Sequence, residues 1–356
     1  MRILIVCDFL LKYASQQARA LSGLGNDVRL LCRSHALEFG GSEAERDELL
    51  DGLREHGVDS VSVPGRIRSL SAVPDMVEIR RSLRRWRPDV VQAHENHDPR
   101  LLALTSGLPS VLTVHDPLGH PGAPALTRSE DWTFRRWFHR ADWFIVHGRA
   151  LADELADLYP GRPIAIVPHG ISPLPQPLPP PPAPSVLLFG RLEQYKGVEV
   201  LVDAMRLVWR QRPEVRLVVA GTGHAARLVP QDERISLLQQ YIPEAGVDGL
   251  FAAASLVVLP YTQASQSGVG AQALARGIPV VVSDAGALPD LAIDQSYVAA
   301  AGSDQSLADA ILAHVDDGPE TRRAVLRHAR DHLSWQHAAE LTADVYRDVL
   351  AARGRR

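Results

Sequence analysis

Short runs of apolar, mostly β-branched residues alternate with longer amphipathic segments along almost the whole chain. This alternation is typical of βα units, in which each strand joins a parallel sheet and each helix returns the chain to the same edge. The runs are continuously apolar, so we expect helices to cover both faces of each sheet. A chain of 356 residues also exceeds what one hydrophobic core usually serves. The sequence therefore predicts an α/β protein with two doubly wound parallel sheets.

The expected strands form two groups on either side of a proline-rich tract. They are residues 3–7, 28–32, 58–63, 90–93, 110–114, 143–146 and 164–167 in the first group, and 185–189, 215–220, 235–238, 256–259, 279–283 and 297–300 in the second. The eight prolines of the tract cannot donate hydrogen bonds and favour stiff polyproline II geometry. We favour a linker over a binding motif for an SH3-like partner. The predicted parts are a first domain at 1–172, a linker at 173–184, a second domain at 185–334 and a terminal helix at 335–356.

The charge balance of the chain argues against a protein dedicated to nucleic acid. Its 38 basic and 42 acidic residues give a net charge of −4, whereas such a protein would carry a basic excess. The apolar run at residues 3–7 is too short for a secretion signal or a membrane span. The two cysteines, Cys7 and Cys32, each end an apolar run and predict neither a disulfide nor a zinc site. We therefore expect a cytoplasmic protein in a reducing compartment.

The strongest signal for a ligand site is the octapeptide from Gly190 to Gly197, which follows the first strand of the second group and opens a helix. Ligands of open α/β sheets bind at the carboxyl ends of strands, and a helix N-terminus there favours an anion. Arg191 and Lys196 add two positive charges, and the only other lysine in this arginine-rich chain is Lys12. The alternative is a solvated basic turn.

A second signal follows the strand that ends at Leu259, where a Ser/Gly-rich turn opens another helix. The backbone N–H groups of Ser267, Gly268 and Val269 could face a phosphate there. Taken alone, this turn favours the simpler interpretation that glycine is needed for steric reasons. The segment 221–223, Gly-Thr-Gly, is weaker still, because its spacing fails the full dinucleotide-binding fingerprint.

Histidines follow two expected strands of the first group. His115 lies just beyond the strand 110–114, where a doubly wound sheet exposes site residues, and His94 and His97 follow the strand 90–93. The chain contains 14 histidines, so most of them are expected to be surface or core groups. The position of His115 favours a functional role.

Taken together, these residues resemble the GT-B glycosyltransferases, specifically the large retaining family known as glycosyltransferase family 4. The resemblance rests on the order and spacing of segments that span nearly the whole chain. They are MRIL at 1–4, RPDVVQAH at 87–94, VHD at 114–116, VPHG at 167–170, GR and KG within 190–197, GTG at 221–223, LPY at 259–261 and GIPVV at 277–281.

The resemblance implies two Rossmann-like domains that face each other across a cleft, with the acceptor bound by the first and a nucleoside-diphosphate sugar by the second. It implies that Arg191 and Lys196 neutralise the departing diphosphate without a metal ion or other cofactor, and that His115 contacts the transferred sugar from the opposite wall. With retention, the leaving phosphate would itself accept the proton of the acceptor. The residues implied in donor binding are Gly190, Arg191, Lys196, Gln266, Ser267, Gly268, Val269 and Gln272.

This chain departs from the family pattern in two places. Ala264 and Gln272 stand where the family usually carries two glutamates, and only Gln272 can still hydrogen-bond a ribose hydroxyl. In a sub-group with a Ser-Gln-Ser-Gly loop, as at residues 265–268, Gln266 or the Ser267 hydroxyl would contact the sugar instead. Near the N-terminus, the sequence Lys-Tyr-Ala-Ser at 12–15 replaces a glycine pair, which predicts an altered acceptor site or reduced catalysis.

We therefore predict a retaining, metal-independent glycosyltransferase that moves a sugar to a hydroxyl of a glycan, a lipid-linked molecule or a natural product. The alternative is a non-catalytic GT-B protein that binds nucleotide sugars or serves as a partner subunit, as the two missing glutamates and the missing glycine pair indicate. A nucleotide-sugar epimerase is disfavoured, because the carboxylate and histidine set of such enzymes cannot be placed. The sequence does not identify the base, the sugar or the acceptor.

The region from Arg66 to Arg87 contains seven arginines and two acidic residues. Within it, a helix would carry an apolar face made of Met76, Ile79, Leu83 and Trp86. Such a basic amphipathic helix can lie on anionic lipid, which would place the protein peripherally at the inner membrane face. We favour the alternative, in which the apolar face packs on the sheet and the arginines are solvated.

Overall fold

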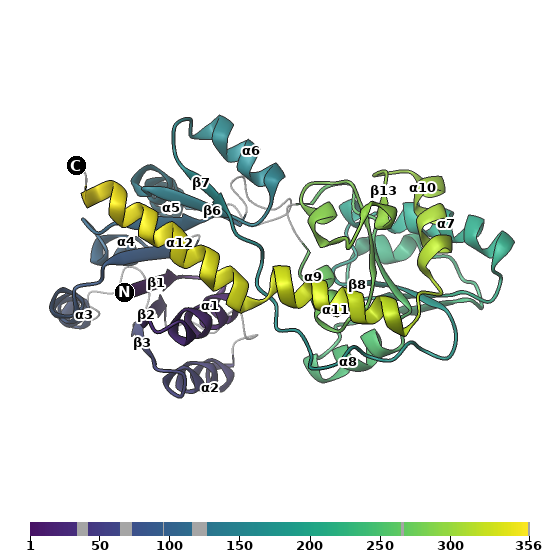
Figure 1. The fold of residues 1–356 in the computed structure, drawn as a ribbon, viewed down its shortest axis with the longest axis horizontal. Helices are drawn as coiled ribbons and strands as arrows, with labels where there is room; N and C mark the ends of the chain where they lie inside the picture. Colours follow the sequence, from purple (N-terminus) through teal and green to yellow (C-terminus); the bar gives the residue numbers. More distant parts are fainter. Residues whose placement is uncertain (34–41, 65–72, 95, 116–126, 265–266, 355–356) are drawn as a thin grey trace. The chain divides into compact units, whose positions relative to one another are not determined.

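A computed structural model describes residues 1–33, 42–64, 73–94, 96–115, 127–264 and 267–354 (Figure 1). The chain divides into two compact units. Unit 1 consists of Met1–His147, Ala152–Gly170 and Trp335–Arg356, and unit 2 of Gly148–Leu151 and Ile171–Ser334. Each unit contains one parallel sheet with helices, so the predicted fold class is confirmed. Every predicted strand is present, with ends that differ by no more than one residue.

The sheet of unit 1 has the strand order β3-β2-β1-β4-β5-β6-β7. Its elements are β1 (Arg2–Cys7), α1 (Leu11–Gly23), β2 (Asp27–Arg33), α2 (Glu43–Arg54), β3 (Val58–Val63), α3 (Val73–Trp86), β4 (Val90–His94), α4 (Pro99–Leu104), β5 (Ser110–Thr113), α5 (Arg128–Arg140), β6 (Trp143–Val146), α6 (Arg149–Leu158), β7 (Ile164–Ile166) and α12 (Trp335–Gly354). Right-handed crossovers place α1 and α2 on one face of this sheet and α4 and α5 on the other.

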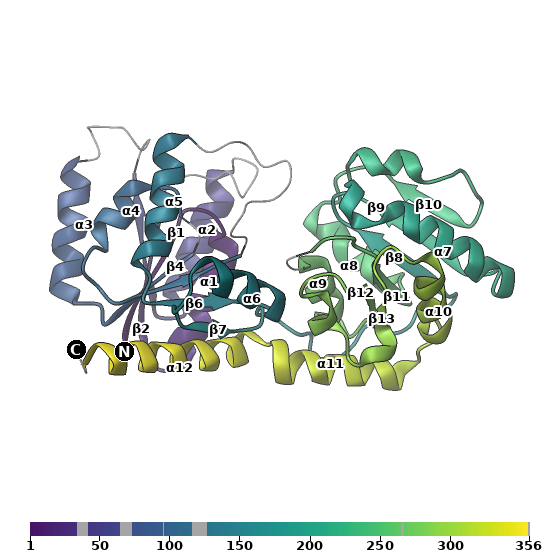
Figure 2. The same cartoon turned by 90° about the horizontal axis from the view of Figure 1, so that it is seen from above.

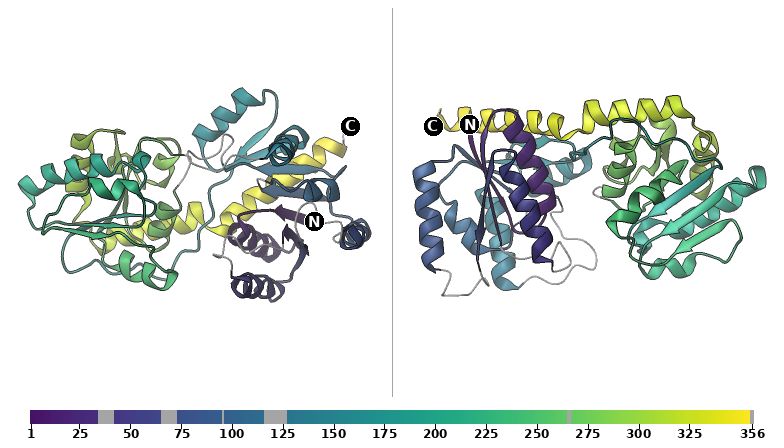
Figure 3. Two further views of the ribbon diagram at one scale, coloured as in Figure 1. Left: turned by 180° about the vertical axis from the view of Figure 1, so that it is seen from behind. Right: turned by 90° about the horizontal axis from the view of Figure 1, so that it is seen from below.

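Helices α1 and α12 lie side by side against the sheet of unit 1 (Figures 1 and 3). Leu21 of α1 and Val349 of α12 are buried in the same apolar cluster as Ile5 of β1. Within this core the Tyr346 hydroxyl donates a hydrogen bond to Oε1 of Gln92 on β4. The C-terminal helix is therefore part of the core of unit 1.

The sheet of unit 2 has the order β10-β9-β8-β11-β12-β13. Its elements are β8 (Ser185–Phe189), η3 (Gln194–Lys196), α7 (Val198–Gln211), β9 (Arg216–Ala220), η4 (His224–Leu228), β10 (Ile235–Leu238), α8 (Glu244–Ala252), β11 (Leu256–Leu259), α9 (Gly268–Ala275), β12 (Val280–Ser283), η5 (Leu288–Leu291), η6 (Gln295–Tyr297), β13 (Val298–Ala299), α10 (Asp304–His314) and α11 (Pro319–Leu333). Helices α7 and α10 pack together, as do α9 and α11 (Figure 2).

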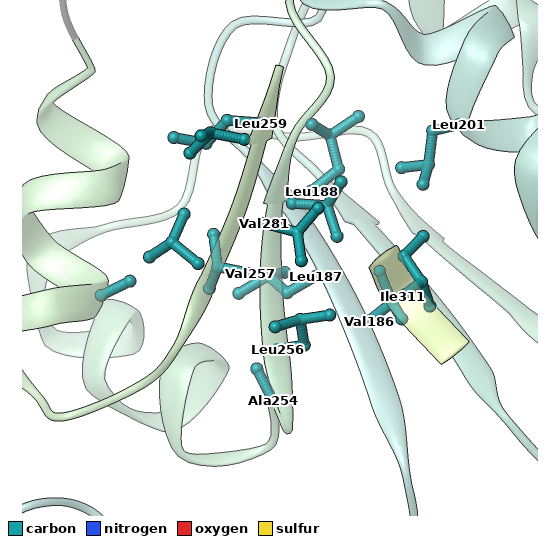
Figure 4. Close-up of a cluster of buried hydrophobic side chains, with 14 of the residues drawn as sticks. Val186, Leu187, Leu188, Leu201, Ala254, Leu256, Val257, Leu259, Val281 and Ile311 are labelled. Carbon is teal, nitrogen blue, oxygen red and sulfur yellow. The ribbon is translucent and has the colours of Figure 1, made fainter. Parts of the chain in front are cut away.

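The core of unit 2 is built by the apolar runs that the sequence analysis identified as strands. Figure 4 shows Leu187 of β8, Val257 of β11 and Val281 of β12 at its centre, with Leu201 of α7 and Ile311 of α10 beside them. All five side chains are buried. Burying a large aliphatic side chain contributes about 1.5–3 kcal/mol, so these runs stabilise the sheet that positions the loops of the site.

The proline-rich segment follows a fixed path over unit 2. The Leu174 N–H donates to the Ala275 carbonyl at 2.8 Å, and the Leu178 N–H donates to the Arg276 carbonyl at 2.9 Å. The buried guanidinium of Arg322 donates a hydrogen bond to the Leu178 carbonyl at 3.1 Å.

In the described part of the chain, no helix combines the length and the apolar character needed to cross a bilayer.

Candidate functional site

The strand order of each sheet reverses once, between β1 and β4 in unit 1 and between β8 and β11 in unit 2. The chain leaves these neighbouring strands in opposite directions, which opens a crevice at their carboxyl ends where ligands of such sheets bind. In unit 2 the crevice is flanked by the β8–α7 loop and the β11–α9 loop. These loops carry the two motifs that the sequence analysis singled out.

The two loops are fixed to each other through their backbones. The Thr262 N–H of the β11–α9 loop donates to the Tyr195 carbonyl of the β8–α7 loop at 2.8 Å. Gly197 has a positive φ of 69°, and a Cβ there would overlap the carbonyl oxygen of Pro260. Glycine is therefore required at this position both by the turn and by the close approach of the second loop.

The β9–η4 loop packs against the other side of the β8–α7 loop. The Leu192 N–H donates to the Thr222 carbonyl at 2.7 Å. Gly221 has φ 137°, and a Cβ on it would overlap the carbonyl oxygen of Gly190. The Gly-Thr-Gly segment thus serves close packing between loops, which explains its presence without the full dinucleotide-binding fingerprint.

Lys196 is half-buried at the end of the short helix η3. Its Nζ lies 3.7 Å from the ring centroid of Tyr261 and 5.0 Å from that of Tyr195. Burial and the neighbouring positive charge of Arg191 lower the pKa of Lys196 to about 8. Within the described part of the chain, no ion pair joins this ammonium to a carboxylate. A desolvated cation without a counter-ion is suited to an anionic ligand.

Helix α9 begins beside this cation. The Ser267 hydroxyl caps the helix by accepting the Gly270 N–H at 3.3 Å, and it also shares a hydrogen bond of 3.2 Å with the Tyr261 hydroxyl. A Cβ on Gly190 would lie 3.4 Å from Cγ2 of Val269, so the end of β8 faces the first turn of α9. The first N–H groups of a helix have no acceptor within it and favour a negative charge.

The predicted donor-site residues therefore lie on adjoining loops of unit 2. Arg191 is exposed on the β8–α7 loop and Gly268 is exposed at the start of α9, while Gln272 is half-buried on the second turn of α9. The Ser267 hydroxyl, named as an alternative sugar contact, is engaged within the protein. Gln266 lies outside the described residues. Arg191, Lys196 and the start of α9 together can bind two negative charges, as a diphosphate carries.

In unit 1, one histidine ends β4 and one follows each of the adjacent strands β5, β6 and β7, and all four rings lie around Tyr13. The centroids of these four rings and of Trp335 lie 4.8–5.6 Å from the Tyr13 centroid, each edge to face. The four histidines are His94, His115, His147 and His169. Tyr13 lies in the first turn of α1, after Leu10 in the left-handed region with φ 65°.

Two hydrogen bonds connect His115 to the interior of unit 1. Nε2 of His94 lies 2.9 Å from Oε1 of Gln17, and Nδ1 of His94 lies 3.3 Å from Nε2 of His115. Burial lowers the pKa of His94 to about 3, so its ring is neutral. Because a carboxamide oxygen only accepts, His94 carries its proton on Nε2 and accepts the Nε2–H of His115. Nε2 of His115 therefore carries a hydrogen.

The ring of His147 lies next to that of His115, with 4.9 Å between the centroids. Its Nδ1–H donates to the Val167 carbonyl at 2.8 Å, and its Nε2 lies 3.4 Å from the Tyr13 hydroxyl. Burial lowers the pKa of His147 to about 3 and also lowers the pKa of His169, while it raises the pKa of Tyr13. The rings of His94, His147 and His169 are therefore polar and uncharged, which suits a neutral hydroxyl ligand.

Asn96 follows β4 and was not identified from the sequence. Its side chain is fully buried, and among the described residues neither its amide nitrogen nor its carbonyl oxygen has a hydrogen-bond partner. Buried polar groups are usually paired, so an unpaired carboxamide calls for a water or a ligand.

Among the described residues, no group of three or more His, Cys, Asp or Glu is arranged to hold a metal ion.

Models of two protein families match the chain, one in each half. The model described as Glycosyltransferase Family 4 matches residues 12–173, and the model described as Glycosyl transferases group 1 matches residues 183–317. Among characterised relatives, a glycogen synthase of Mycobacterium tuberculosis is 28% identical over 392 residues, which cover 99% of this chain and 93% of the relative. A D-inositol 3-phosphate glycosyltransferase of Saccharomonospora viridis is 30% identical over 247 residues, 60% of this chain and 57% of that protein.

Solved structures share the arrangement of two parallel sheets. A glycosyltransferase from Rickettsia africae superposes with a TM-score of 0.67 at 12% identity over 98% of each chain. Anabaena HepE in complex with UDP superposes with a TM-score of 0.65 at 16% identity, over 98% of this chain and 100% of that one. At these identities the likeness shows the fold, which is that of the GT-B glycosyltransferases.

Proposed function

Because the chain belongs to the family 4 and group 1 glycosyltransferases, we propose that it transfers a sugar from a nucleoside-diphosphate sugar to a hydroxyl acceptor. We propose further that the transfer retains the anomeric configuration and needs no metal ion. The acceptor classes are those named above: a glycan, a lipid-linked molecule or a natural product.

The observation that carries this proposal is the positive charge beside the start of α9, which pairs with no carboxylate of the described residues. Lys196 and Arg191 lie on one loop, and the cation of Lys196 is held against aromatic rings rather than a carboxylate. A departing nucleoside diphosphate gains negative charge as the bond to the sugar breaks. Fixed positive groups that face this charge lower the barrier to transfer.

In the proposed reaction, the bond between the anomeric carbon and the diphosphate oxygen breaks, and a bond between that carbon and the acceptor oxygen forms. The acceptor attacks from the face that the diphosphate leaves. The proton of the acceptor hydroxyl passes to the departing phosphate, whose charge Arg191 and Lys196 hold. This order of events accounts for retention without a nucleophilic side chain.

His115 and Gln272 have positioning roles in this proposal. His115 contacts a hydroxyl of the transferred sugar, and its hydrogen bond to His94 orients the ring. Gln272 hydrogen-bonds the ribose. The neutral rings of His94 and His147 beside Tyr13 support binding of an uncharged sugar or acceptor on unit 1.

A thermal-shift screen with UDP, GDP, TDP and ADP tests the donor site, because a ligand that binds only the folded protein raises its melting temperature. We expect one nucleotide to give a selective shift that Arg191→Ala and Lys196→Ala each lose. Arg210→Ala, which removes an exposed charge from the last turn of α7, is the matched control and should keep the shift. No shift with any nucleoside diphosphate would refute the proposal.

A non-catalytic nucleotide-sugar binder is the second candidate, and the position of Tyr13 is the observation that favours it. The Tyr13 ring lies 5.1 Å from the His115 ring, centroid to centroid, in the segment where the family carries a glycine pair. A bulky ring at this place would restrict the acceptor side. Nucleotide binding without turnover, followed by turnover in Tyr13→Gly, would establish this second candidate.

We also propose a peripheral contact of α3 with anionic lipid at the inner membrane face. Ile79 and Leu83 are buried, as the packing alternative predicts, but Val73 and Val77 are 53% and 43% exposed. Arg80, Arg81, Arg84 and Arg85 are exposed on the same helix. We expect the protein to sediment with anionic vesicles at physiological salt and not with neutral ones. Equal recovery with both vesicles would overturn this proposal.

A further inference from the structure

Tyr261 contacts both Lys196 and the start of α9, which are the two parts of the proposed diphosphate site. It does not itself face the proposed ligand. Its side chain is fully buried. One face of its ring lies 3.7 Å from Nζ of Lys196, and its hydroxyl lies 3.2 Å from the hydroxyl of Ser267 at the start of α9. Its carbonyl accepts a hydrogen bond from Oγ of Ser283 at 2.6 Å, which fixes the backbone behind it.

An aromatic ring holds a cation differently from a carboxylate. A carboxylate would pair with the Lys196 ammonium and cancel its charge. The negative face of a tyrosine ring attracts the ammonium through its quadrupole and leaves the full positive charge in place. Two of the three N–H bonds of an ammonium above one ring also remain available for oxygen ligands. Lys196 is therefore both immobilised and charged.

The hydroxyl of Tyr261 holds the start of α9 through Ser267. Ser267 accepts the Gly270 N–H and thereby caps α9. A cap that is itself held by a buried phenol cannot rotate away from this position. Burial raises the pKa of Tyr261 to about 12, so the hydroxyl keeps its proton throughout the neutral range.

We propose that Tyr261 is a positioning residue of the diphosphate site, whose ring holds the Lys196 ammonium and whose hydroxyl holds the start of α9, so that one side chain sets the distance between the two. This inference rests on the proposed function, because it assigns Tyr261 a role in nucleoside-diphosphate binding. It identifies a residue that acts through Lys196 and Ser267 rather than on the ligand.

A double-mutant cycle on the affinity for UDP, or for whichever nucleoside diphosphate the screen selects, tests the coupling. We expect Tyr261→Leu to weaken binding on the order of 50-fold, about tenfold through loss of the ring and about fivefold through loss of the hydroxyl, and Lys196→Ala to weaken it on the order of 30-fold. In the Lys196→Ala background, Tyr261→Leu should cost only the roughly fivefold of the hydroxyl, because the ring acts through the lysine. Additive losses would overturn the inference.

Two further variants separate the ring from the hydroxyl. Tyr261→Phe keeps the ring and should lose roughly fivefold in affinity. Tyr297→Phe is its matched control, because the buried Tyr297 also uses its hydroxyl, in a 2.5 Å hydrogen bond to Asp317. This control should bind the nucleotide as the wild type does. Equal losses in the two phenylalanine variants would mean that only general stability is affected.

A spectroscopic readout needs no nucleotide. Because the chain contains only Lys12 and Lys196, labelling with [13Cε]lysine gives two sets of signals, assigned with Lys12→Arg. The ring of Tyr261 should shift the Lys196 signals upfield in the wild type and in Tyr261→Phe, but not in Tyr261→Leu. If Tyr261→Leu does not fold, an unshifted Lys196 signal in the wild type would itself overturn the inference. Failure of every nucleotide to bind, with the upfield shift present, would instead refute the proposed function.

Discussion

Nδ1 of His94 lies 3.3 Å from Nε2 of His115, and the far nitrogen of His94 is held by Gln17. The arrangement fixes His115 with its proton on Nε2 only as long as Gln17 offers an acceptor. We expect Gln17→Leu to release both rings into mixtures of tautomers. Long-range 1H–15N correlation spectra of histidine-labelled protein report the tautomer of each ring. Gln16→Leu, a neighbouring substitution on α1, should leave the spectrum of His115 unchanged.

The pKa of Lys196 makes nucleotide binding dependent on pH. A diphosphate needs the charged ammonium, and the free site holds that proton only below its pKa of about 8. The bound anion raises the pKa of Lys196. The affinity for the nucleotide is therefore constant just below pH 8 and falls above it. In that higher range the site takes up a proton when the nucleotide binds. Calorimetry in buffers of different ionisation enthalpy measures the uptake. Arg stays charged in this range, so Lys196→Arg should remove the dependence, and a wild-type affinity that is flat to pH 9.5 would contradict the assignment.

The close approach of the two donor-site loops depends on Gly197. An alanine there would be strained at φ 69° and would overlap the Pro260 carbonyl. We expect Gly197→Ala to lower the free energy of unfolding by about 2–4 kcal/mol and to abolish nucleotide binding. Gly249→Ala on α8, where a Cβ meets open space, should be neutral or stabilising by about 0.5–1 kcal/mol. Chemical denaturation measures the free energy of unfolding of both variants. Similar values would show that the close approach at Gly197 does not hold the two loops together.

Replacing the buried carboxamide of Asn96 should change the stability and the function of the protein in different ways. Its two buried polar atoms have no partner in the part of the chain that the structure describes, so Asn96→Leu should raise the free energy of unfolding by roughly 1–3 kcal/mol. If the carboxamide binds an acceptor hydroxyl, the same variant raises the KM for the acceptor and leaves the affinity for the nucleotide unchanged. Thermal unfolding and nucleotide titration measure the two effects. A lower melting temperature would mean that the wild-type side chain is satisfied by a structural water.

The fold was predictable because the strands are continuous apolar runs whose ends coincide with turn residues. The position of Lys196 in the loop that follows β8 was predictable for the same reason, since ligand sites of such sheets lie at the carboxyl ends of strands. What could not be predicted was the partner of Lys196, because Tyr261 lies on another loop and no local pattern links the two. Gly221 was assessed as a weak nucleotide motif, whereas its place in the structure is set by contact with Gly190.

In the histidine cluster too, the sequence indicates single residues but not the contacts between them. His94 and His115 were recognised individually from their positions after strands. Their hydrogen bond depends on the pairing of β4 with β5, and the contacts of His147 and His169 with Tyr13 depend on β6, β7 and α1. The sequence shows Tyr13 only as part of the segment 12–15 that replaces a glycine pair, because its contacts with four imidazoles depend on residues at or just after the ends of four strands.

The central claim is sugar transfer from a nucleoside-diphosphate donor, and 1H NMR of a reaction mixture tests it most directly. The protein is incubated with the nucleotide sugar that the screen selects and with sugar, polyol and lipid-linked acceptors, and both the released diphosphate and the anomeric signal of the product are followed. We predict release of the nucleoside diphosphate with an anomeric configuration identical to that of the donor, and loss of both signals in Lys196→Ala. An inverted product would contradict the retaining mechanism, and tight nucleotide binding without release would contradict catalysis.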